Sequence, residues 1–390
     1  MGQIQLRGCH GGATIKGLRI TGLRELKIPI PSQAVTELVE NLCQLENNLY
    51  AQLEKVRLLK QKLFSAEDET KFDLRGWNIE AQVLSESVIQ ADDFSFQMRN
   101  AFPHVLAYPY RNLNAIQNEA DIYREQLRIA ENLLAYLGSI GLAMISISQL
   151  EDNTNKSSLT LQMLSEYWRG GISPGDWQDI GRRSGQFLRN DQQSSGIASF
   201  AALWFKGKGS KLSDFTRTLQ ELITTKNDFK HDRGPQGDEY ERAIQSLKEK
   251  LDNAFHAIAF FVQYPIRLIQ SIDNDWKTKE TVISTLVYAG DHPGLRQEKL
   301  TTSQIISKGK LYLDLSHDFL VPLYPLISVH YCNSCKTRET YMIDRWEGRD
   351  GRTVLKSFER GHTHDNNEIA KKVGEDFADW LQNLHFEEES

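Results

Sequence analysis

The stretch EYERAIQSLKEKLDNAFHAIAFFVQ, residues 239–263, has a clear helical periodicity. Its apolar side chains recur at intervals of three and four residues, which places them on one face of an α-helix. They are Ile244, Leu247, Leu251, Phe255, Ile258 and Val262. Tyr264 and Pro265 follow, and a proline there ends the helix. A helix with one apolar face needs partners, so the stretch predicts a helical bundle.

Four further segments predict helices that pack beside this one. They cover residues 119–147, 159–169, 177–188 and 212–225. The last of them spaces Phe215, Leu219 and Leu222 at intervals of four and three. We therefore expect a helical bundle over residues 118–265.

The sequence changes character after residue 265. Three short runs rich in β-branched and aromatic residues are bounded by Gly, Pro and Asp, as strands usually are. These runs are residues 282–288, 311–315 and 340–343, and a final helix is expected near 366–384. Residues 266–390 therefore predict a small α/β domain.

Residues 32–64 carry a heptad repeat. Apolar residues recur every seven positions at Val35, Leu42, Leu49, Val56 and Leu63, and Leu38, Leu45 and Leu59 fill the second seam position. Gln52 is the polar interruption of the seam. A surface helix normally has a broader stripe, so this pattern favours a coiled-coil helix with Ser32 as its N-cap.

Two segments flank this helix. Residues 1–31 are rich in glycine and predict a β fragment that is too short to fold alone. Residues 65–117 begin with a charged linker and reach a run at 102–110 that contains two prolines, which we expect to be extended and packed on the helices. The fold class expected is mainly α: a long coiled-coil helix plus a helical bundle, with a small α/β C-terminal domain.

The composition is that of a globular protein. A chain of 390 residues is long enough for two or three domains, and its formal net charge of −6 argues against indiscriminate coating of nucleic acid. Four cysteines are too few for a disulfide scaffold in a chain of this length. Apolar runs fall short of a membrane span, and the start lacks the apolar core of a signal peptide. We expect a cytoplasmic protein with no membrane association.

The positive charge is concentrated in one region. Residues 180–233 contain ten Lys or Arg and five Asp or Glu, which leaves a local excess of five positive charges. Such a patch can meet phosphate. A solvated helix face explains the same residues at least as well.

The run LRELKIPIPS at residues 23–32, followed by the heptad helix, gives a first resemblance. Residues 13–64 look like the end of a target-recognition domain and its spacer helix in type I restriction specificity subunits. In that family the helix pairs with a second spacer helix and separates two DNA-reading domains. Only 31 residues precede the helix here, so the resemblance implies pairing and not DNA reading by this chain alone.

The run KNDFKH at residues 226–231 gives a second resemblance, which covers roughly residues 100–365. It is similar to the Arg-Asn-x-x-x-His signature of HEPN domains, in which two copies meet and paired Arg and His residues cleave RNA without metal. The runs FFVQYP, LYPLI, CNSC and GH, which begin at residues 260, 323, 332 and 361, resemble a module fused to bacterial HEPN-like domains.

This resemblance implies His231, Lys226 and Asn227 as catalytic residues. Lys230 and Arg233 lie close by in the sequence and are the expected RNA contacts. A histidine, whose usual pKa is about 6.5, can take the proton of a 2′-hydroxyl or protonate the leaving oxygen, and a dimer supplies two. Lys226 stands where the family has Arg, and lysine lacks the planar fork that grips phosphate. The competing interpretation of His231 is a histidine at the start of a helix, with its ring hydrogen-bonded to backbone groups.

Cys332 and Cys335 form a single Cys-x-x-Cys pair. A structural zinc needs four ligands, and His362 and His364 are the nearest candidates for a second pair. Two reduced thiols buried in a β-hairpin are the preferred interpretation of the pair, zinc is the second, and a redox pair is the third. No cofactor is expected for catalysis.

The function expected is a bacterial defence-associated homodimer that binds RNA. Its site either cleaves the RNA in the manner of a toxin or is a degenerate site with a structural or RNA-binding role. Its expected partners are a second copy, RNA, and a defence-complex protein or an antitoxin. The alternative function is a non-catalytic adaptor that docks a restriction–modification or other defence complex. A third interpretation is that the bundle only oligomerises.

Overall fold

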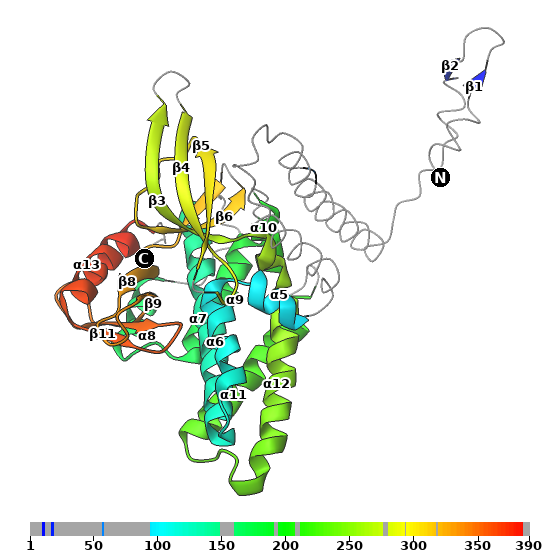
Figure 1. The fold of residues 1–390 in the computed structure, drawn as a ribbon, viewed down its shortest axis with the longest axis vertical. Coiled ribbons are helices and arrows are strands. Elements are labelled where there is room, and N and C mark those ends of the chain that lie inside the picture. Colours follow the sequence, from blue (N-terminus) through cyan, green and yellow to red (C-terminus); the bar gives the residue numbers. More distant parts are fainter. Residues whose placement is uncertain are drawn as a thin grey trace, which may run out of the picture. The chain divides into compact units, whose positions relative to one another are not determined.

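The computed structural model (Figure 1) describes residues 94–148, 160–190, 194–206, 211–275, 280–292, 294–316 and 319–384, together with residues 10–11, 17–18 and 57. Contacts divide the chain into two units, Met1–Ala91 and Asp92–Ser390. In the first unit, β1 (His10–Gly11) and β2 (Gly17–Leu18) form an antiparallel pair. The coiled-coil helix expected over residues 32–64 lies outside the described residues apart from Arg57.

The second unit is built around α7 (Glu119–Ile147), whose bounds match the helix expected there. The Asn118 side chain accepts a hydrogen bond from the Asp121 N–H and caps its first turn. Helix α7 is apolar and long enough to cross a membrane, but 89% of its apolar window is buried inside this unit. It is therefore the core helix against which the other layers pack.

The remaining helices surround α7. They are α5 (Phe94–Asn100), α6 (His104–Asn112), α8 (Leu161–Arg169), α9 (Pro174–Phe187), α10 (Ser195–Ala202), α11 (Asp214–Lys230) and α12 (Tyr240–Ala257). The helices expected at 159–169, 177–188, 212–225 and 239–263 are confirmed as α8, α9, α11 and α12, with shifted ends.

The segment expected to be extended at residues 102–110 is instead largely helix α6. Pro103 occupies the N-cap position, where a proline removes no intrahelical bond, and Pro109 lies inside the helix. Val105, Leu106 and Ala107 are buried in the core shared with α7. Burial of this face outweighs the local cost of the internal proline.

Residues after 265 form two antiparallel sheets. The first has the order β5-β4-β3-β6-β7, and the second has the order β11-β10-β9-β8. The first sheet contains β3 (Ile266–Asp275), β4 (Glu280–Tyr288), β5 (Arg296–Thr302), β6 (Leu311–Ser316) and β7 (Phe319–Pro322). The second contains β8 (Ile327–Tyr331), β9 (Arg338–Trp346), β10 (Thr353–Ser357) and β11 (Thr363–Asp365), and α13 (Glu368–Gln382) follows.

The prediction of a mainly α protein is wrong, because these strands make the chain a mixed α/β protein. Several strands have too little alternation to stand out in the sequence. Strand β5 reads RQEKLTT and is an edge strand. Its Arg296 and Lys299 are exposed, whereas Glu298 pairs with the buried Arg267 of β3. The strands expected at 282–288, 311–315 and 340–343 are confirmed within β4, β6 and β9.

Helices and sheets share the main hydrophobic core. A second, small cluster lies on the five-stranded sheet and contains Ile269, Ile283, Leu300, Tyr312 and Leu320. The Trp168 indole of α8 donates to the Ile343 carbonyl of β9 over 2.9 Å. On α7, Asn132 donates to the Phe358 carbonyl after β10 over 2.7 Å. The boundary expected near residue 265 thus separates helices from strands but not one compact unit from another.

Candidate functional site

The turn between α11 and α12 carries the HEPN-like run. Figure 1 shows this turn at the end of the helical layer away from the five-stranded sheet. The side chains of Asn227, Lys230 and His231 are exposed. Lys230 and His231 follow Asn227 by three and four residues, about one helical turn, so all three lie on the same face at the end of α11. Within the described part of the chain their side chains make no hydrogen bond or ion pair. The competing interpretation of His231, a ring bonded to backbone groups, has no such bond to support it.

The backbone around His231 closes the end of α11 tightly. The His231 N–H donates to the carbonyls of Asn227 and Asp228, and the Arg233 N–H donates to Asp228 over 2.8 Å. Asp232 takes the left-handed conformation, with φ 57°, that ends many helices. The Arg233 side chain is 66% exposed and pairs with Asp228 at 3.1 Å. Arg233 therefore lies near His231, but Asp228 partly neutralises its positive charge.

Lys226 points away from this exposed face. Its ammonium lies 3.4 Å from Glu131 of α7, and Lys356 of β10 lies 3.0 Å from the other oxygen of the same carboxylate. Burial acts to raise the pKa of Glu131, but Lys356 and Lys226 outweigh it and hold that pKa below its usual range. Lys226 thus joins α11 to the core helix, apart from Asn227, Lys230 and His231.

Three of the four predicted metal ligands come together in the second sheet. Cys332 Sγ lies 3.2 Å from His362 Nδ1, and Cys335 follows in the same turn. The fourth neighbour is Glu339, whose carboxylate lies 3.0 Å from Cys335 Sγ and 3.2 Å from His362 Nδ1. The ligand atoms of these four residues all lie within 4.8 Å of one another.

His364 is not part of this cluster. It is buried in β11, its Nδ1 lies 2.8 Å from the Asn367 amide, and its ring lies against Tyr341. Glu339 takes the place that His364 was expected to fill. The available sequence signal was a glutamate four residues after Cys335, directly before the apolar run at 340–343.

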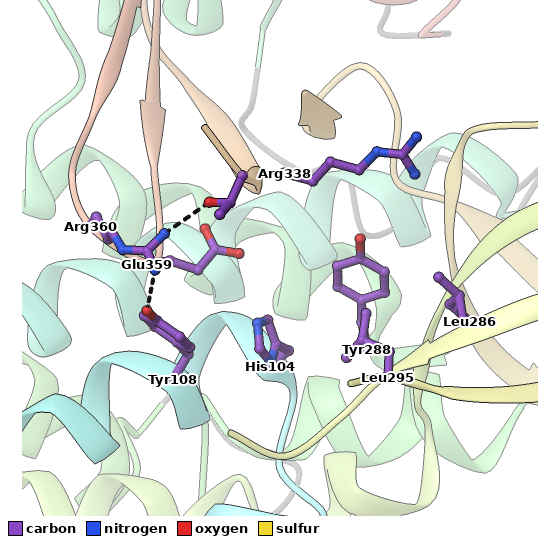
Figure 2. Close-up of a pocket in the computed structure, with 9 residues that line it drawn as sticks. His104, Tyr108, Leu286, Tyr288, Leu295, Arg338, Glu359 and Arg360 are labelled. Carbon is purple, nitrogen blue, oxygen red and sulfur yellow. Dashed lines mark hydrogen bonds between the residues drawn. The ribbon is translucent and has the colours of Figure 1, made fainter. Parts of the chain in front are cut away.

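A cavity of about 330 Å³ adjoins this cluster (Figure 2). It is lined by His104 and Tyr108 of α6, Leu286 and Tyr288 of β4, Leu295, Thr337, Arg338, Glu359 and Arg360. Arg360 connects cavity and cluster, because it donates to the Tyr108 hydroxyl on one side and to Glu339 on the other. None of these cavity residues stands out in the sequence, since they come from α6 and from segments that follow it far along the chain, as far as Arg360.

Burial perturbs three titratable groups in the cavity. Desolvation lowers the pKa of His104, whose Nδ1 lies 2.7 Å from the Gly290 carbonyl. It raises the pKa of Glu359 to about 7 and that of Tyr288 to about 12. Figure 2 shows these three side chains around one hollow, with the Arg338 guanidinium beside them, which can pair with an anionic ligand.

No family model, curated protein sequence or solved structure matches this chain.

Proposed function

We propose that this chain is a cytoplasmic, homodimeric RNA-binding protein that cleaves RNA without metal, with the site at the α11–α12 turn. The observation that carries the proposal is the shared exposed face of Asn227, Lys230 and His231, whose side chains have no described role in holding the fold. Polar groups gathered on a solvent-facing helix end are available to a ligand. The match of Asn227 and His231 to the HEPN signature gives that ligand its class, which is RNA.

The chemistry needs a second copy of the chain. One imidazole takes the proton from the 2′-hydroxyl, which attacks the adjacent phosphorus, and a second imidazole protonates the leaving 5′-oxygen. A two-fold axis near the α11–α12 turn brings two His231 rings to one phosphate. Lys230 then supplies the cation nearest to the developing charge, and Asn227 supplies an amide donor.

The pairing of Lys226 with Glu131 gives this site a weakened form of the family arrangement. Glu131 holds Lys226 away from the exposed face of Asn227, Lys230 and His231, so the Lys226 ammonium must leave that carboxylate before it can contact an RNA phosphate. Arginine in place of Lys226 carries the planar fork that grips phosphate bidentately, so once turned to that face it holds the phosphate better than lysine does.

The test is cleavage of cellular RNA and of a model RNA by the purified full-length protein in EDTA. Wild type is expected to cleave, and His231→Ala to lower the rate by about 10²–10⁴-fold, the usual contribution of a general base. Lys226→Arg is expected to raise the rate. His292→Ala, which removes an exposed histidine of the β4–β5 turn, is the matched control.

Sedimentation separates a lost site from a lost dimer, because His231→Ala should leave the dimer intact. Absence of cleavage by both wild type and Lys226→Arg would reject the nuclease. RNA binding that persists unchanged in His231→Ala and Lys230→Ala would place any RNA site elsewhere, and the adaptor function would then be preferred.

A further inference from the structure

We propose that Cys332, Cys335, His362 and Glu339 bind one zinc ion, which clamps two turns of the second sheet together. Zinc bonds of about 2.0–2.3 Å in a tetrahedron place the ligand atoms about 3.3–3.8 Å apart. Three of the six ligand pairs lie at 3.0–3.2 Å, and the largest separation is under 4.8 Å. Shifts of a few tenths of an ångström up to about 1 Å complete the tetrahedron.

The turn between β8 and β9 is built to present two sulfurs on one side. The Cys332 N–H donates to the Thr337 carbonyl over 2.8 Å, and the Lys336 N–H donates to the Cys332 carbonyl over 3.0 Å. Lys336 takes the left-handed conformation, with φ 59°, directly after Cys335. This reversal returns the chain so that both thiols of the Cys-x-x-Cys face the same point, as a chelating pair must.

The other two ligands come from strand β9 and from the β10–β11 turn. Glu339 begins the buried part of β9, and its side chain is fully buried. His362 lies in the turn between β10 and β11, where Gly361 has φ 70° and the Ser357 N–H donates to the His362 carbonyl over 2.8 Å. Both ligands are therefore held by strand pairing and not by a free loop.

Charge also favours an ion at this point. Two thiolates and one carboxylate carry −3, so zinc leaves −1, and the adjacent Arg360 brings the group to neutrality. Arg360 lies 2.8 Å from Glu339 Oε1 and 3.4 Å from Cys335 Sγ, while the Tyr341 hydroxyl lies 3.3 Å from Glu339 Oε2. These are the outer contacts that orient metal ligands in zinc sites. On binding, the two thiols release their protons to solvent.

The ligand set selects zinc over other common ions. Two sulfurs and an imidazole are soft or borderline donors, whereas magnesium and calcium prefer oxygen alone. A disulfide between Cys332 and Cys335 is the competing chemistry. A disulfide does not explain why the Glu339 carboxylate and the His362 imidazole lie beside the two thiols.

The clamp has a structural consequence for the cavity. Zinc fixes the β8–β9 turn against the β10–β11 turn, and Thr337 and Arg360 lie directly beside these ligands. Both residues also line the cavity beside His104 and Tyr108. The ion would thus set the position of the cavity wall. This proposal is independent of the RNA site at the α11–α12 turn.

The test is the zinc content of the full-length protein after growth with zinc and after reconstitution with zinc chloride. About one zinc per chain is expected by mass spectrometry. Cys332→Ser with Cys335→Ser should lose it, and Glu339→Gln should weaken zinc affinity at least about tenfold. Cys9→Ser with Cys43→Ser is the matched control for the thiols, and His364→Asn is the control for His362→Asn. Both controls should keep the ion.

A measurement on the wild type keeps the proposal falsifiable if the cysteine variants fail to fold. X-ray absorption should find two sulfurs at about 2.3 Å from zinc, with two lighter ligands at about 2.0–2.2 Å. A zinc-free wild type after reconstitution, zinc retained by the double cysteine variant, or zinc with no sulfur ligand would each overturn the proposal. So would a Cys332–Cys335 disulfide in protein purified without oxidant.

Discussion

At the scale of single residues, burial moves His104 and Glu359 toward the same neutral state from opposite sides. Desolvation lowers the pKa of the imidazole and raises that of the carboxyl, because both shifts disfavour the charged form. His104 faces the Gly290 carbonyl, Tyr108, Tyr288 and Asp291. The Gly290 carbonyl and the Asp291 charge act to raise the pKa of His104, but the effect of burial is larger.

The variant His104→Gln tests whether burial lowers the pKa of His104. In the unfolded chain His104 takes up a proton below about pH 6.5, whereas in the folded protein it does so only at a lower pH. Between these two pKa values the unfolded state binds more protons, so the stability of the wild type decreases as the pH is lowered. Relative to the variant, the wild-type free energy of unfolding should fall by up to about 1 kcal/mol per pH unit below 6.5. Urea unfolding between about pH 5 and 8 measures it, with exposed His292→Gln as the control. Parallel pH curves for wild type and His104→Gln would contradict the shift.

At the scale of elements, α9 is a helix shaped by the side chain that packs on it. Its start is specified locally, since Ser173 and Asp176 form a capping box around Pro174. Farther along, Gly181 and Gly185 leave room for the buried Trp204 indole, which occupies the space where a Cβ would lie. These glycines lower helix propensity, and the close approach of the tryptophan is the compensating gain.

Gly185→Ala should destabilise the protein by about 1–3 kcal/mol, because overpacking against Trp204 exceeds the gain of about 1 kcal/mol in helix propensity. The loss should appear in chemical unfolding followed by tryptophan fluorescence. Gly175→Ala, in the same helix, is the matched control, since its nearest neighbour is Ser173 Oγ at an ordinary 3.6 Å. Equal stability of Gly185→Ala and wild type would mean that the indole moves aside freely.

At the scale of the whole molecule, helices and sheets in Asp92–Ser390 are joined by buried polar contacts as well as by one core. Asn132 and Arg128 of α7 both donate to the Phe358 carbonyl, each over 2.7 Å, and Arg128 reaches the Glu359 carbonyl as well. These bonds attach the core helix to the turn that follows β10. That turn carries Arg360 and leads to His362.

Asn132→Ala should lower the free energy of unfolding by about 1–3 kcal/mol, because it removes a buried bond and leaves a small cavity. Since the junction is shared, helix and sheet signals should still unfold together, with far-ultraviolet circular dichroism and tryptophan fluorescence giving one midpoint. Arg124→Ala, an exposed α7 residue in a surface ion pair, should change stability by less than about 0.5 kcal/mol. Two separate transitions in Asn132→Ala would show that helices and sheets are independent.

The sequence by itself determined most of the helices, because a 3.6-residue periodicity is local and α7, α11, α12 and α13 bury one or more faces against neighbours. It also located the Cys-x-x-Cys pair and His362, and the exposed run that ends at His231. Strands with clear apolar runs, such as β4 and β6, were predictable for the same reason.

Only the tertiary structure decided the rest. Helix α6 forms in spite of its internal Pro109 because its face is buried, and β5 pairs as a charged edge strand through its backbone. Glu339 replaces His364 in the metal cluster, and Lys226 turns to Glu131. The cavity joins residues from His104 to Arg360. Each of these depends on which segments lie side by side, and local sequence patterns carry no information about such distant contacts.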